Sequence, residues 1–184
     1  SVPYFWGTLG IVYNDKFVKP GAIKTWNDLW SKKYRRQILL VDSARDAMGM
    51  ALVSLGYSMN TTSSIKLHLA QTKLNSLGPN IKAIISDEMK MYLVQNEAAI
   101  GVTWSGEAYE MMEQNPHLHY VVPKQGSNLW FDNFVIPKTV QNKKAALKFI
   151  NFMLEPKNAA QNAEYVGYAT PNTAAQKLLP KKVR

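Results

Sequence analysis

The sequence predicts an α/β protein in which a largely parallel sheet is flanked by helices, for two reasons. Segments with the apolar spacing of helices alternate along the 184-residue chain with short segments rich in β-branched and aromatic residues. Several of these short segments are nearly continuous apolar runs, which is typical of parallel strands covered on both faces. The composition, 46% hydrophobic and 19% charged, is globular and excludes disordered, collagen-like and coiled-coil chains.

Aromatic and capping residues predict the first elements. The segment Val2–Asn14 predicts a strand that is interrupted at Gly7. Thr25 and Asp28 give a capping-box-like start to a short helix. The compact apolar run Ile38–Val41 predicts the next strand.

A pair of helices is expected after this strand. The first ends at Gly56 and has an apolar face formed by Ala44, Met48, Ala51, Leu52 and Leu55. Ser63 or Ser64 caps the second, which ends at the Gly78-Pro79 pair. Its predicted inward residues are Leu67, Leu74 and Leu77.

The rest of the chain continues the alternation of strands and helices. Strands are expected at Ile81–Ile85, 98–104, 120–122 and 129–136. Helices are expected to begin at Asp87 and Ser105, and to cover 142–154 and 157–166. The helix at 142–154 is strongly amphipathic, with a predicted inward face of Ala145, Ala146, Phe149, Ile150 and Met153.

The chain is basic, with 22 Lys and Arg against 13 Asp and Glu and a net charge of +9. The tightest basic groups are Lys32, Lys33, Arg35 and Arg36, and the tail residues Lys177, Lys181, Lys182 and Arg184. Because both groups lie in turn-like or terminal sequence, a solvated surface is favoured over a phosphate-binding groove. A basic nucleic-acid-binding module stays open as an alternative from a different functional class.

The sequence lacks the constellations that enzymes and metal sites need. The absence of cysteine excludes disulfides, thiolate zinc sites and a cysteine nucleophile, and no phosphate loop, dinucleotide fingerprint or nucleophile elbow is present. His117 and His119 have the spacing of a metal half-site, but no nearby carboxylate is expected to complete it, so a surface turn is favoured. We therefore predict no catalytic residue, no metal and no cofactor.

No apolar run approaches the roughly 18 residues of a membrane span. No signal-peptide h-region is visible either, so any export signal is expected to have been removed or to lie outside this sequence.

Aromatic and acidic residues occur together in several turns. Three such segments, 42–46, 104–107 and 130–132, are expected at the carboxyl ends of strands, and 167–171 presents a tyrosine after a helix. An aromatic ring and a carboxylate together suit an organic ammonium ion, because the ring attracts the cation and the carboxylate adds charge-assisted hydrogen bonds. These segments favour a cleft that binds an organic cation.

At this point the motifs resemble those of the spermidine/putrescine-binding proteins of polyamine ABC transporters. The resemblance covers essentially the whole chain, in order, through the segments 2–8, 25–30, 41–46, 55–62, 101–106, 130–137, 145–154 and 166–172. It implies a type II periplasmic-binding-protein fold, in which two α/β lobes joined by crossing strands hold the polyamine between them.

The resemblance also implies a ligand-binding set. Trp104 and Trp130 correspond to walls of an aromatic box, Asp132 to an acid that pairs with an ammonium group, and Tyr168 to a residue that closes the pocket. Where spermidine-preferring members carry two acids three residues apart, this chain has Ser43 and Asp46, so the first acid is lost and the second is shorter than the usual glutamate. A serine offers a neutral hydrogen bond worth about 1 kcal/mol where the acid would pair with an ammonium group, so a different ligand preference among polyamines is expected.

The resemblance implies a domain organisation for the chain. Residues 1–9 correspond to a hinge or crossing strand, 10–122 to the second lobe, 123–168 to a segment that returns to the first lobe, and 169–184 to a tail. Members of the family carry about a hundred more residues before the motif at Val2, so the chain is expected to lack most of the first lobe. Bare apolar surface then favours a homodimer or domain-swapped dimer.

These observations predict a non-enzymatic, polyamine-binding component of an ABC importer. Its expected partners are a polyamine ligand and the membrane permease, with no nucleic acid. Its expected location is the periplasm or, through a lipid anchor, the cell surface. A protein that binds another small organic cation or solute is the alternative, because of Ser43.

Overall fold

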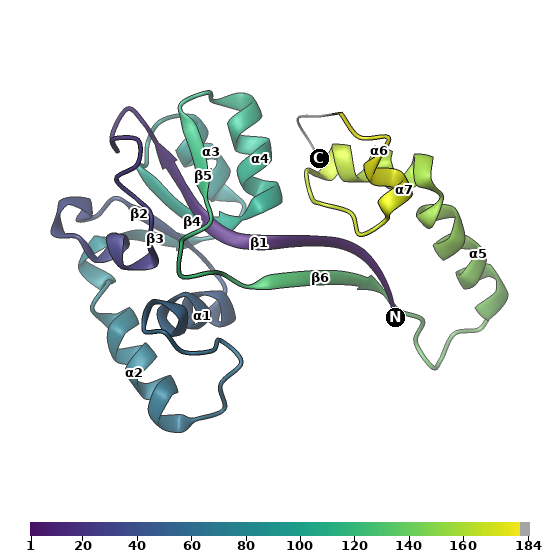
Figure 1. Cartoon of the computed structure of the whole chain (residues 1–184), viewed down its shortest axis with the longest axis horizontal. Coiled ribbons are helices and arrows are strands. Elements are labelled where there is room, and N and C mark those ends of the chain that lie inside the picture. Colours follow the sequence, from purple (N-terminus) through teal and green to yellow (C-terminus); the bar gives the residue numbers. More distant parts are fainter. Residues whose placement is uncertain (181–184) are drawn as a thin grey trace. The chain divides into compact units, whose positions relative to one another are not determined.

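The computed structural model describes residues 1–180, which form two compact units (Figure 1). The sheet unit is Thr8–Asn128, and the terminal unit consists of Ser1–Gly7 and the chain from Leu129 onward. The chain therefore passes between the units twice, at Gly7-Thr8 and at Asn128-Leu129. The basic tail residues Lys181, Lys182 and Arg184, and with them the end of the expected 169–184 tail, lie outside the described residues.

The sheet unit is built on five strands in the order β3-β2-β4-β1-β5. These strands are β1 (Val2–Asn14), β2 (Ile38–Val41), β3 (Ile81–Ile85), β4 (Ile100–Trp104) and β5 (Leu118–Val121). β2 runs parallel to both β3 and β4, whereas β1 runs antiparallel to β4 and β5. The α/β class predicted from the sequence is confirmed. β1 continues through Gly7 without a break, so the predicted interruption there is wrong.

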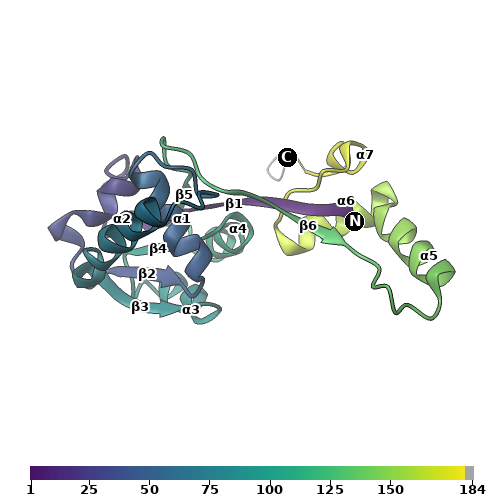
Figure 2. The same ribbon diagram turned by 90° about the horizontal axis from the view of Figure 1, so that it is seen from below.

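Helices cover both faces of the parallel strands. They are α1 (Ala44–Ser54), α2 (Ser64–Asn75), α3 (Glu88–Val94) and α4 (Ser105–Gln114), with the short 3-10 helices η1 (Trp26–Trp30), η2 (Lys32–Tyr34) and η3 (Gly78–Asn80). Figure 1 shows α1 and α2 on one side of these strands and α3 and α4 on the other, and the turned view in Figure 2 agrees. This covering explains why β2 is buried along its whole length.

Capping residues set the starts of α1 and α2, and the cap of α2 is one that the sequence predicts. The side chain of Ser43 accepts a hydrogen bond from Asp46 N at the start of α1, and Ser63 caps α2 in the same way. In α2 the predicted inward position of Leu67 is wrong: this side chain is exposed, and Ala70 is the residue that is fully buried. α2 buries little more than Ala70, because α1 is the only described helix that packs closely against α2.

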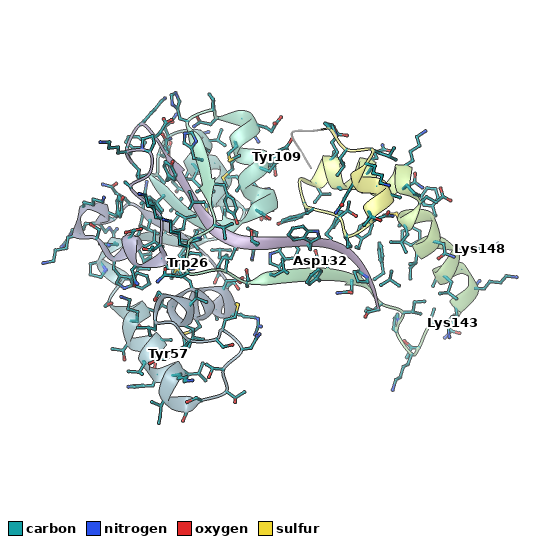
Figure 3. The ribbon with its side chains drawn as sticks, in the orientation of Figure 1. Trp26, Tyr57, Tyr109, Asp132, Lys143 and Lys148 are labelled. Atoms are coloured by element: carbon teal, nitrogen blue, oxygen red, sulfur yellow. The ribbon has the colours of Figure 1, made fainter. Side chains whose placement is uncertain are left out.

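The core of the sheet unit is formed by large aliphatic and aromatic side chains from every layer. Its fully buried members include Ile11, Leu29, Ile38, Leu39, Met50, Leu93, Ile100 and Met111. Trp26, labelled in Figure 3, belongs to the same core, and its indole Nε1 donates to the carbonyl of Gly126 at 2.9 Å. That bond holds the segment before Asn128 against the core.

The terminal unit has fewer and smaller buried side chains. It consists of β6 (Leu129–Phe134), which pairs with β1, and the helices α5 (Lys143–Leu154), α6 (Pro156–Val166) and α7 (Thr173–Gln176). Its core consists of Phe5, Ala159, Ala160, Ala163, Ala175 and Leu179. The sequence predicts α5 and α6 but misses the short α7, whose N-cap Asn172 accepts hydrogen bonds from two backbone amides.

Much of α5 is exposed. Of the residues predicted to face inward, Ile150 is buried, whereas Ala145 and Phe149 are exposed, Phe149 to 57%. Lys143 and Lys148 project from the same helix in Figure 3. The apolar face is present as predicted, but among residues 1–180 little of it is covered. None of the helices in this described part is both long enough and apolar enough to span a membrane.

Candidate functional site

Three predicted site residues meet in the sheet unit, at the edge where β2 and β4 end. Because these strands are parallel neighbours, α1 and the end of β4 lie at the same edge of the sheet. Asp46, in the first turn of α1, is only 7% exposed, and its Oδ2 accepts a hydrogen bond from Nε1 of Trp104 at 3.2 Å. Ser43 lies beside them and accepts a hydrogen bond from Asp46 N at 3.3 Å. The structure thus brings Ser43, Asp46 and Trp104 together.

Asn128 completes this group, and sequence reasoning missed it. Its Nδ2 donates to the second carboxylate oxygen of Asp46 at 2.8 Å, and its Oδ1 accepts from the backbone amide of Leu9 at 2.9 Å. Both oxygens of Asp46 therefore have partners. An asparagine 82 residues away from the acid carries no local signal of this role, so only the fold reveals it.

Glu107, the acid of the predicted segment after β4, is engaged elsewhere. Its carboxylate forms an ion pair with Lys90 at 2.6 Å, and Lys90 also pairs with Glu110 at 2.6 Å. Partial burial lowers the pKa of Lys90, but hydrogen bonds to the two glutamates outweigh it and raise the pKa above its ordinary value. The Glu107 carboxylate is therefore already paired within the sheet unit.

A large hollow in the sheet unit does not suit a cation. It has a volume of about 1000 Å³ and is lined by Asp42, Ser43 and mainly apolar residues of β2, β3 and α2. Its wall has no aromatic ring and includes Arg36 and Lys82. Because these two positive charges outnumber the single carboxylate of Asp42 in the wall, the aromatic and acidic group of Asp46 and Trp104 is the better candidate.

The other three predicted site residues belong to the terminal unit. Trp130 and Asp132 lie two apart on β6, so their side chains share one face of the strand. The ring of Tyr168 meets that of Trp130 edge-on, with centroids 4.8 Å apart and an interplanar angle of 86°. Asp132 is exposed and labelled on β6 in Figure 3. The expectation that 130–132 lies at the carboxyl end of a strand is wrong, because these residues lie inside β6, which continues to Phe134.

The end of α6 fixes the position of Tyr168. Gly167 caps this helix with a φ of 77°, a left-handed conformation that glycine adopts without strain. One residue after Tyr168, the carbonyl of Ala169 accepts a hydrogen bond from Trp6 N at 2.9 Å. The tyrosine is thus held between a helix end and β1.

The two histidines before and in β5 have an acidic partner that the sequence does not reveal. Asp15 Oδ1 lies 2.7 Å from Nδ1 of His117, and its Oδ2 lies 2.8 Å from Nε2 of His119. The expectation of no nearby carboxylate is wrong, because the antiparallel pairing of β1 with β5 brings Asp15 beside them. Hydrogen bonds from His119 and His117 hold the pKa of Asp15 below its ordinary value. Within residues 1–180 no group of three or more His, Asp or Glu side chains is arranged to hold a metal ion.

Known proteins match this chain along its length. The family described as bacterial extracellular solute-binding protein matches residues 1–183. The spermidine/putrescine-binding periplasmic protein of Salmonella typhimurium is 42% identical over 183 residues, which cover 100% of this chain and 53% of that protein.

Solved structures agree with this match. The spermidine/putrescine ABC transporter substrate-binding protein of Streptococcus pneumoniae is 58% identical, with a TM-score of 0.88 over 100% of this chain and 56% of that chain. The TpPotD lipoprotein of Treponema pallidum is 28% identical, with a TM-score of 0.86 over 95% of this chain and 56% of that chain.

These similarities confirm the resemblance to polyamine-binding proteins and do not favour the nucleic-acid alternative. The chain spans about half the length of the curated relatives that it matches. It belongs to the family of bacterial extracellular solute-binding proteins.

Proposed function

We propose that this chain is a solute-binding component of an ABC importer and that it binds polyamines such as spermidine and putrescine. The observation that carries the proposal is the match of the whole chain to a protein named for binding spermidine and putrescine. The proposed location is outside the cytoplasmic membrane, as the name of that relative states for the relative itself. We assign no catalytic step to the chain.

The chemistry of both groups of site residues supports the proposal. Each group combines a tryptophan with an aspartate: Trp104 with Asp46 in the sheet unit, and Trp130 with Asp132 in the terminal unit. A protonated amine gains about 2 kcal/mol from a desolvated aromatic face, and the exposed carboxylate of Asp132 adds charge-assisted hydrogen bonds. Tyr168 adds a third ring beside Trp130. A polyamine, which alternates ammonium groups with methylene segments, fits such sets.

Asp132→Ala tests the proposal directly. We expect spermidine and putrescine to bind this chain with a Kd of about 10 μM or tighter in isothermal titration. Removing the exposed Asp132 carboxylate should weaken binding about 10- to 100-fold, because charge-assisted hydrogen bonds are lost. The matched control is Asp87→Ala, which removes the same charge from an exposed aspartate outside both groups. Absence of heat with either amine, or equal loss in the two variants, would contradict polyamine binding at this site.

A different small organic cation is the second candidate, and Ser43 is the observation that favours it. The serine hydroxyl caps α1 and offers a neutral hydrogen bond where an acid would pair with an ammonium group. Titration with choline, which has one quaternary ammonium group, distinguishes the two ligand classes. Tighter binding of choline than of either polyamine would favour the second candidate.

The proposed partners are the membrane permease of the importer and a second copy of this chain. Dimerisation is supported by apolar side chains that β6 and α5 leave exposed, namely Phe131, Leu147, Phe149 and Phe152. Sedimentation velocity at micromolar concentration is the test. A dimer that dissociates in Phe149→Lys supports this proposal, whereas a monomer across the concentration range contradicts it.

A further inference from the structure

The carboxylate of Asp46 is surrounded by donors that belong to the protein itself. One oxygen accepts from the indole of Trp104 and the other from the side-chain amide of Asn128, at 3.2 and 2.8 Å. The side chain is buried in the first turn of α1. Asp46 therefore already orients two neighbours without any ligand.

Asn128 extends this network to the backbone of β1. Its Oδ1 accepts from Leu9 N at 2.9 Å, and the neighbouring Ser127 Oγ donates to Leu9 O at 2.5 Å. One residue earlier, Thr8 N donates to Oγ of Ser105, which directly follows Trp104 in the chain. The start of the sheet unit is thus bonded to residues beside the candidate ligand site.

These bonds lie where the chain passes between the two units. Asn128 is the last residue of the sheet unit before its second passage, and Leu9 is the second residue after the first passage. The line of hydrogen bonds Trp104–Asp46–Asn128–Leu9 therefore links a candidate ligand residue to both passages. All four residues belong to the sheet unit, so the network is complete within it.

We infer that Asp46 is a positioning residue, which orients Trp104 and, through Asn128, couples this ring to both chain passages. The role follows from the occupied oxygens of its carboxylate and from its burial. This inference deepens the proposed function, and its prediction for spermidine binding rests on that function. Asn128 becomes a determinant of that function although it is neither aromatic nor acidic.

Exchange of the two side chains tests the inference. In Asn128→Asp two carboxylates face each other, so the network should break. In the double variant Asp46→Asn with Asn128→Asp, one amide and one carboxylate are again present. The amide now at position 46 can donate to the carboxylate at position 128 and accept from Trp104. That carboxylate can still accept from Leu9 N, so the network should return.

Two readouts need no ligand and are made by NMR on the complete 184-residue chain. Asn128→Asp should speed exchange of the Leu9 amide by about tenfold or more and shift the Trp104 indole proton resonance, assigned with Trp104→Phe. The double variant should restore both signals, since a coupled pair is non-additive. If neither signal moves in the single variant, or the double variant shows the sum of two independent losses, the inference is overturned.

Titration with spermidine separates the inference from the proposed function. Positioning predicts that affinity falls in Asn128→Asp and returns to within about threefold in the double variant, because the network returns. If Asp46 instead pairs directly with an ammonium group, the double variant moves this charge and stays weak, which overturns the positioning role. If the unmodified chain binds no polyamine, the proposed function fails, while the Leu9 and Trp104 signals still decide whether the network exists.

Discussion

Ser43 combines a structural role, the capping of α1, with a proposed role in ligand preference. Its hydroxyl caps α1, and it occupies a position where the family resemblance implies an acid. Aspartate is as good an N-cap as serine and its charge suits a helix N-terminus. The cap therefore does not by itself require serine, and the residue is free to set ligand preference.

Ser43→Asp should consequently raise polyamine affinity without loss of stability. We expect spermidine to bind about tenfold tighter, because a carboxylate replaces a neutral hydroxyl, and the free energy of unfolding to change by less than about 0.5 kcal/mol. Ser43→Ala is the control, and it should cost about 1 kcal/mol of stability because the cap is lost. Titration calorimetry and urea unfolding measure the two quantities. Unchanged affinity in Ser43→Asp would show that position 43 is remote from the ligand.

Asp15 gives the sheet unit an acid-sensitive contact. Hydrogen bonds from His119 and His117 lower its pKa, so protonation of Asp15 is harder in the folded than in the unfolded chain. Its contribution to stability is present above its unfolded pKa of about 4 and is lost as the pH falls through the lower folded value.

We expect Asp15→Asn to reduce the loss of stability between about pH 4 and pH 2, since this variant has no carboxylate to protonate. Urea unfolding midpoints measured from pH 7 to pH 2 provide the test. The control is Asp87→Asn, at an exposed acid without a side-chain cap bond. Its urea unfolding midpoint should change with pH as steeply as that of the unmodified chain. If the urea midpoints of Asp15→Asn and of the unmodified chain fall equally with pH, Asp15 is not the source of this acid-sensitive stability.

Local sequence patterns predicted part of the candidate site, and long-range contacts supplied the rest. Trp104 and Asp46 could be proposed because each lies where a strand ends or a helix begins. Asn128 and Asp15 could not, because their partners lie 82 and about a hundred residues away in sequence. Hydrogen bonds of this kind depend on strand order and register, which local periodicity does not encode.

At the level of elements, β1 depends on a close approach between Gly10 and Tyr120 of β5. A Cβ placed on Gly10 would lie 2.4 Å from Cζ of the Tyr120 ring. The hydroxyl of this tyrosine donates to the Thr8 carbonyl at 2.9 Å, and burial raises the pKa of Tyr120 to about 12. The hydrogen bond to Thr8 thus holds the ring over β1.

Gly10→Ala should therefore destabilise the sheet unit by about 1–3 kcal/mol through overpacking. Tyr120 would have to leave its hydrogen bonds to Thr8. Gly78→Ala is the matched control, because a Cβ placed on Gly78 meets no atom within 4 Å and the backbone there is not left-handed. Chemical unfolding followed by circular dichroism measures both variants. Equal stability of Gly10→Ala and Gly78→Ala would contradict the close packing of Tyr120 on β1.

Element boundaries were predicted well where capping residues and glycines mark them, as at Thr25, Ser63 and Gly167. The direction of helix faces was predicted less well. Leu67 and Phe149 fit apolar helical spacing but are exposed, because spacing identifies an apolar stripe without showing what covers it. The packing partner is a tertiary property, and α2 and α5 have few partners in the described part of the chain.

For the molecule as a whole, the contrast between the two cores predicts how it unfolds. The sheet unit buries large side chains such as Leu39, Ile100 and Met111, whereas four of the six core residues of the terminal unit are alanines. Burial contributes about 25 cal/mol per Å² of apolar area, so the terminal unit gains less from its core. We therefore expect the two units to unfold in separate steps, the terminal unit first.

Hydrogen exchange followed by mass spectrometry at increasing urea concentration measures this order. Peptides from α5 and α6 should lose protection at lower urea than peptides from β2 and β4. Leu39→Ala should cost about 2–5 kcal/mol in the sheet-unit step, because it leaves a cavity in a fully buried site. Leu39→Ala should leave the first step, which is unfolding of the terminal unit, unchanged, because Leu39 belongs to the core of the sheet unit. Leu179→Ala should shift only this first step to lower urea concentration, because Leu179 belongs to the core of the terminal unit. A single transition shared by all peptides, shifted equally by both variants, would show instead that the chain folds as one cooperative unit.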